Sequence, residues 1–213
     1  MVNLKKRKIN LFKTIRNLVV LSALVIASLF FVNYLNKEET DLINVIGTID
    51  AYSYELREED SEYQKEIFFK LKEVMSLEDV NDEEYAKYLG KLFLVDFYTM
   101  DTKLNNQDIG GVKFIYSKFQ ESFVMYSRDE IYAHVESRLN RNRNQILPIV
   151  DNVSMTNIEM DDDSTYIIDY ELSYQNSNRL EVKPPGKARI NMAFEDEKLV
   201  IVDFKTFSNS EWY

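Results

Sequence analysis

An uncharged segment near the start of the chain constrains the fold more than any other feature. Residues 17–36 contain no Asp, Glu, Lys or Arg, and residues 18–35 read LVVLSALVIASLFFVNYL. At a rise of about 1.5 Å per residue, roughly 20 helical residues cross a hydrocarbon layer about 30 Å thick. A buried helix of a globular domain normally keeps a polar stripe over this length. The segment is therefore predicted to be one transmembrane helix that anchors the chain in a lipid bilayer.

The flanks of this segment predict its orientation. The preceding residues carry basic groups and no acidic one: Lys5, Lys6, Arg7, Lys8, Lys13 and Arg16. Cytoplasmic flanks are enriched in Lys and Arg, so residues 1–16 are predicted to be a cytoplasmic tail and the rest of the chain extracytoplasmic. A cleaved signal peptide is the alternative, but its apolar core usually runs for about 7–15 residues and ends in small residues. Here the segment is longer and ends through Phe30, Phe31 and Tyr34, which favours an uncleaved single-pass anchor in the cell membrane.

The charge of the outer part excludes one class of partner. Subtracting the six N-terminal positive charges from the net charge of −10 leaves −16 for residues 37–213. Such a domain repels a phosphate backbone, so nucleic acid is not expected as a partner. The chain has no Cys and one His, which excludes disulfides, thiolate metal sites and a Cys nucleophile. No cofactor and no metal are expected.

The first half of the outer part has helical periodicity. Residues 45–56 show a partial period of two and predict one strand within a juxtamembrane segment, 37–59. Asp60 is the expected N-cap of a first helix, and Asn81 with Glu84 predicts the start of a second. The second helix is apolar on nearly every face from residue 92 to residue 100 and is expected to be the central buried one. Gly110-Gly111 marks a loop. Helical spacing resumes over 112–123, and Ser127 with Glu130 predicts another capped helix that ends near residue 139.

The second half alternates with a period of two. Four strands are predicted, over residues 150–160, 166–174, 188–195 and 199–207. Their short connections predict an antiparallel meander. Helices followed by strands indicate an α+β domain, residues 60–208, with the helices on one face of a curved sheet of about four strands. Residues 209–213 are left as a C-terminal tail.

This order of elements resembles a known family. The carrying segments are the aromatic-rich helix Leu-Phe-Leu-Val-Asp-Phe-Tyr at 92–98, the turn over 99–111, and the four strands between 149 and 207. Together with the basic tail and single membrane helix, they resemble VirB8-like proteins, scaffold components of type IV secretion and conjugation machines. The resemblance covers most of residues 45–207 and is one of architecture. It implies an NTF2-like (cystatin-like) fold, a fold that also hosts enzymes and ligand pockets.

Few residues suggest catalysis. Asp96 lies in an apolar helix stretch, where a buried carboxylate could act as an acid with a raised pKa or could pair with a Lys or Arg and with backbone groups. His134 is spaced by four from Glu130 and Arg138, which suits a solvated row of ion pairs as well as a general base. The run 161–163 of three Asp residues suits an acidic hairpin turn better than a cation site. No catalytic residue is assigned, and Asp96 is retained as a candidate buried functional carboxylate.

Aromatic residues suggest binding instead. Tyr166, Tyr170 and Tyr174 share one face of a strand, and Trp212 and Tyr213 end the chain. Such residues are enriched at interfaces, although packing against the helices is the more common fate of tyrosines on one strand face. We therefore expect a membrane-anchored, non-catalytic scaffold domain of a bacterial cell-envelope assembly, with other envelope proteins or further copies of itself as partners. An NTF2-like sensor for a ligand or peptide is the alternative, followed by an enzyme that uses carboxylates alone.

Overall fold

The computed structural model describes residues 19–22, 24–28, 43–138, 141, 145–180 and 183–207. The chain divides into two compact units, Met1–Ile43 and Asn44–Tyr213. In the first unit, the described residues 19–22 and 24–28 are helical and exposed. Within the described residues, no helix is both long and apolar enough to span a membrane. Most of the predicted anchor, 17–36, lies outside those residues, as do Trp212 and Tyr213.

The second unit is an α+β domain, as expected. It begins with a hairpin of β1 (Val45–Ile49) and β2 (Tyr54–Arg57), joined by a short 3-10 turn, and this pair forms a sheet of its own. The single strand predicted over 45–56 is therefore two strands. Ser53 makes the reversal possible with a φ of 48°, the left-handed conformation common in turns. The hairpin lies within the compact unit Asn44–Tyr213.

Two helices follow the hairpin. Helix α2 (Glu62–Met75) begins after Ser61, whose hydroxyl accepts from the Gln64 backbone N–H, so the expected N-cap at Asp60 is wrong by one residue. Helix α3 (Asp82–Tyr98) begins after Asn81, whose side chain accepts from the Glu84 N–H, as predicted. From Leu92 onward nearly every residue of α3 is buried, which makes α3 the central helix.

The segment after α3 differs from the expected pair of helices. Residues 112–123 form two 3-10 turns, Val112–Phe114 and Ser117–Phe119, and the start of a short helix, α4 (Gln120–Tyr126). Ser127 does not cap a new helix; it continues α4 into a π-helical turn, Ser127–Ile131. The helix stops there because Tyr132 turns inward, fully buried, and its hydroxyl donates to the backbone carbonyl of Phe97.

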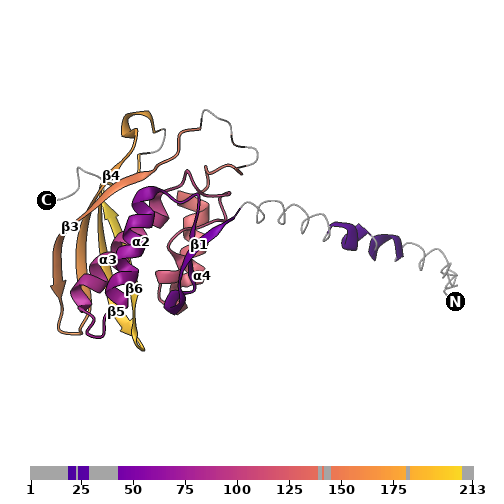
Figure 1. Cartoon of the computed structure of the whole chain (residues 1–213). Coiled ribbons are helices and arrows are strands. Elements are labelled where there is room, and N and C mark those ends of the chain that lie inside the picture. Colours follow the sequence, from indigo (N-terminus) through magenta and orange to yellow (C-terminus); the bar gives the residue numbers. More distant parts are fainter. Residues whose placement is uncertain are drawn as a thin grey trace, which may run out of the picture. The chain divides into compact units, whose positions relative to one another are not determined.

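The predicted meander is confirmed. Strands β3 (Val150–Met160), β4 (Tyr166–Tyr174), β5 (Lys187–Glu195) and β6 (Lys198–Phe207) pair antiparallel in the order β3-β4-β5-β6. Figure 1 shows α2 and α3 lying across one face of this sheet. The core fills the layer between them, because alternate strand residues such as Ile168, Ile190 and Met192 are fully buried on the face that α3 covers. The four-stranded sheet and the helices on it agree with the predicted fold class.

Candidate functional site

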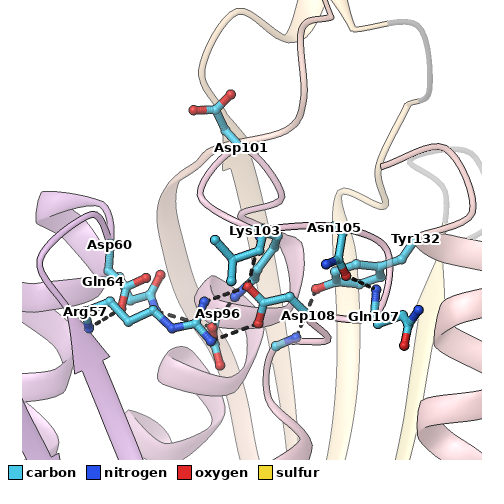
Figure 2. Close-up of polar contacts among 12 residues, drawn as sticks. Arg57, Asp60, Gln64, Asp96, Asp101, Lys103, Asn105, Gln107, Asp108 and Tyr132 are labelled. Atoms are coloured by element: carbon cyan, nitrogen blue, oxygen red, sulfur yellow. Dashed lines mark hydrogen bonds and ion pairs between the residues drawn. The ribbon is translucent and has the colours of Figure 1, made fainter. Parts of the chain in front are cut away.

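A cluster of charged side chains, three buried and two partly buried, lies where the end of α3 meets the hairpin. It consists of Arg57, Asp60, Asp96, Lys103 and Asp108, and is called here the buried charge cluster (Figure 2). Its centre is an ion pair: Lys103 Nζ lies 2.5 Å from Asp96 Oδ1, and both side chains are at most 10% exposed. Removing either partner would leave the other charge buried alone, which costs far more than losing an exposed pair.

The loop after α3 brings backbone groups to the same carboxylate. The Gly111 N–H donates to Asp96 Oδ2 over 2.7 Å. Gly110 packs so tightly on α3 that a Cβ there would lie 2.1 Å from the carbonyl oxygen of Asp96, and Gly111 has a φ of 73°. Only glycine permits the close approach at residue 110, and glycine is the residue best suited to the left-handed backbone at residue 111. The Gly-Gly pair thus places a hydrogen-bond donor on Asp96.

A second ion pair ties the hairpin to this loop. The Arg57 guanidinium, at the end of β2, binds Asp108 through two hydrogen bonds of 2.6 and 2.8 Å. Asp108 also accepts from the Leu104 backbone N–H. Burial alone would raise the pKa of Asp108, but Arg57 and then Lys103 outweigh burial and hold the pKa below its ordinary value. This bidentate geometry is the strong form of a carboxylate–guanidinium contact.

The cluster lines a small polar cavity of about 160 Å³. Asp96 and Asp108 are each engaged by a cation and by a backbone N–H, and Asp60 accepts from the Arg57 backbone N–H. For Lys103, burial lowers the pKa, but the Coulombic pull of Asp96 and the other nearby carboxylates outweighs burial, so the pKa lies above its ordinary value. A general base or acid needs a carboxyl group free to exchange its proton with a substrate. Asp96 makes the contacts that the sequence offered as its alternative, an ion pair with a Lys and a hydrogen bond from a backbone group.

The predicted interface tyrosines face the helices. Tyr170 is buried and its hydroxyl donates to the backbone carbonyls of Ala86 and Lys87 on α3. Tyr166 is also buried. Tyr174 is half-buried and donates to the Pro185 carbonyl. Of these three described tyrosines, Tyr174 alone presents an appreciable surface to a partner.

The remaining sequence candidates have local roles. Asp161 accepts from the backbone N–H groups of Asp163 and Thr165, so the acidic run forms the β3–β4 turn. The backbone carbonyl of His134 accepts from the Gln145 side chain. In the described part of the chain, no three His, Asp or Glu side chains are grouped as metal ligands.

An apolar groove was not foreseen from the sequence. It lies between α4 and β6, has a volume of about 380 Å³, and is called here the α4–β6 groove. Its wall on the α4 side includes Phe119, Phe123 and Tyr126, and its β6 side includes Ile201 and Phe204. The two sides come from segments about 80 residues apart, so no local sequence pattern could reveal the groove.

Comparison with known proteins does not assign the chain to a group. No family model, curated protein or solved structure matches this sequence or its structure.

Proposed function

We propose that this protein is a membrane-anchored, non-catalytic interaction domain that acts as a scaffold in a bacterial cell-envelope assembly. The uncharged segment 17–36 and its basic flank support the anchor and its orientation. A helical layer on a four-stranded meander supports the resemblance to NTF2-like, VirB8-like subunits of secretion or conjugation machines. The ion pairs and backbone hydrogen bonds of Asp96 and Asp108 support a role other than catalysis for these two carboxylates.

The observation that carries the proposal is the exposure of α4. This helix holds Phe123, Val124, Met125 and Tyr126 in seven residues, and none of its residues is buried. Tyr126 is 62% exposed and Met125 52%. A short apolar helix gains little from folding if its side chains stay in water. Large, exposed aromatic and Met side chains next to a groove are typical anchors of protein–protein interfaces.

The proposal predicts that Tyr126→Ser weakens partner capture. We expect recovery of envelope proteins crosslinked to the full-length protein in its native membrane to fall about tenfold or more, since an interface anchor contributes roughly 2 kcal/mol or more. Mass spectrometry of the crosslinked material measures this. Phe69→Ser is the matched control, because Phe69 is an aromatic residue of similar exposure on α2. Equal losses in both variants, or recovery of the protein alone, would contradict the proposal.

A second candidate function is binding of a small apolar ligand. The α4–β6 groove favours it, because about 380 Å³ lies within the volume range of ligand pockets and the lining is mostly apolar. The outer domain's negative charge disfavours acidic ligands. An uncharged, mostly apolar molecule fits these properties best.

This second candidate predicts that Ser122→Trp blocks the groove. Ser122 lines the groove and is exposed, so an indole there fills space without disturbing the core. We expect an uncharged alkyl diazirine, photoactivated on the full-length protein, to label α4 and β6 residues and to lose most of that labelling in the variant. Ser154→Trp, at an exposed position of β3, is the control. Labelling spread evenly over the surface, or unchanged by Ser122→Trp, would remove this candidate.

A further inference from the structure

The buried charge cluster contains one carboxylate more than its cations can pair. Lys103 pairs with Asp96, and Arg57 pairs with Asp108. Among the described residues, no Lys or Arg side chain lies within ion-pair distance of Asp60, and its carboxylate Oδ2 accepts from the Arg57 backbone N–H over 2.8 Å. With all five groups ionised, the cluster therefore holds a net charge of −1 in a buried position.

A buried excess charge is costly, and a proton on Asp60 would remove it. Asp60 is 5% exposed. Burial raises the pKa of Asp60 to about 6; Lys103, from the loop, opposes this increase, while Asp96, from α3, adds to it. The other charged group that faces Asp60 is the Arg57 side chain from β2, and the Tyr54 hydroxyl from the same strand is also nearby. The cluster is neutral only when Asp60 is protonated.

Asp60 lies where the hairpin joins the helices. It follows β2, directly precedes the Ser61 N-cap of α2, and bonds to the backbone of Arg57. Arg57 in turn binds the loop after α3 through Asp108. The cost of ionising the Asp60 carboxylate therefore weakens the contact between the hairpin and the helical layer.

We propose that Asp60 is the proton-binding group of a latch that fastens the β1–β2 hairpin to the helical layer more tightly in mildly acidic medium than at neutral pH. A solvent proton binds the Asp60 carboxylate in the closed hairpin and returns to solvent as the pH rises. This latch is independent of which partner or ligand the domain takes.

The direction of the effect follows from the two pKa values. In the unfolded chain Asp60 has its ordinary value of 3.8, and in the folded domain about 6. The folded state therefore holds the proton more tightly, and its stabilisation by that proton is complete below about pH 4 and is lost as the pH rises through about 6. Asp60→Asn keeps an acceptor for the Arg57 N–H but cannot ionise, so it fixes the latch in its closed form.

The test is hydrogen exchange of the full-length protein between pH 5 and 7, corrected for intrinsic exchange. The readout is the protection of the hairpin amides relative to the β4–β5 amides of the same molecule. We expect this ratio to fall by up to roughly tenfold from pH 5 to 7, and to stay constant in Asp60→Asn. Asp101→Asn is the control, since it makes the same change at an exposed carboxylate in the loop after α3 (Figure 2).

The pH dependence of the protection ratio in the three proteins distinguishes a latch at Asp60 from its absence. A pH-dependent ratio in the unsubstituted protein and in Asp101→Asn, but not in Asp60→Asn, supports the latch. An unchanged pH dependence in Asp60→Asn, or a ratio that is constant in all three proteins, overturns it. The thermal midpoint is a second measurement: at pH 7 Asp60→Asn should melt higher than the unsubstituted protein by a few degrees, roughly 3–8 °C, and a lower midpoint counts against the proposal.

Discussion

Asp96→Asn will destabilise the domain by about 3–5 kcal/mol, because it removes the only carboxylate charge in direct ion-pair contact with the buried Lys103 ammonium among the described residues. Lys103 is 2% exposed, and its Nζ lies 2.5 Å from Asp96 Oδ1. Asparagine matches the shape of aspartate and can still accept from the Gly111 N–H. The decrease in the free energy of unfolding therefore results from loss of the charge and not from a cavity. Urea unfolding followed by circular dichroism measures it.

Two further variants make this result specific. Asp96→Asn combined with Lys103→Met removes both charges, and we expect it to recover a large part of the lost stability, since a buried pair replaced by apolar or neutral groups is often tolerated. Glu73→Gln breaks the exposed pair between Lys70 and Glu73 on α2 and should leave the unfolding midpoint unchanged. If Asp96→Asn were as mild as Glu73→Gln, the ion pair would not have the structural role assigned to it.

Gly90→Ala will be about as damaging as the charge substitution, for a steric reason. A Cβ at residue 90 would lie 2.2 Å from the Tyr170 hydroxyl, 2.7 Å from Tyr170 Cζ and 2.8 Å from Met192 Cε. These groups are buried between α3 and the sheet, so the helix must move away from β4 and β5. Overpacking a core costs about 1–3 kcal/mol and sometimes more, and we expect a value at or above the upper end.

The same contact supplies its own control. Tyr170→Phe removes the closest atom, so adding it to Gly90→Ala should restore part of the stability, although Cζ and Met192 still crowd the new methyl group. Gly47→Ala places a Cβ 3.0 Å from the Phe68 ring edge and should be milder. Chemical denaturation of the unsubstituted protein, Gly90→Ala, Tyr170→Phe and the double variant measures the coupling between residues 90 and 170. Strictly additive losses for Gly90→Ala and Tyr170→Phe would contradict the packing described between α3 and β4.

The elements that the sequence predicted well are those held by local patterns. The Asn81 cap, the apolar run that ends α3 and the alternating strands were all visible, because period and capping chemistry act within a few residues. The meander followed from short connections. The helix predicted after Ser127 failed, because a serine followed three residues later by a glutamate satisfies the cap pattern whether or not the preceding turn is already helical. The burial of Tyr132 decided where that helix ends.

In the candidate site, too, local patterns indicated single residues and tertiary packing brought them together. The sequence marked Asp96 as a carboxylate in an apolar helix and Gly110-Gly111 as a loop, yet it gave no means of joining them. No local pattern singled out Arg57, Lys103 or Asp108, because it is the packing of the hairpin and loop against α3 that removes them, wholly or in part, from water.

By itself, the sequence determined the α+β class, the strand order and the type of most elements, since these depend on interactions between residues close in the chain. It also carries the prediction of an anchor at 17–36. Tertiary structure alone decided that Tyr170 points into the core and that α4 leaves Met125 and Tyr126 exposed. It also decided that five charges from β2, the turn before α2, α3 and the loop after α3 share one site. The reason is physical: burial, and with it the energy of a charge or an aromatic ring, depends on which distant segments pack together.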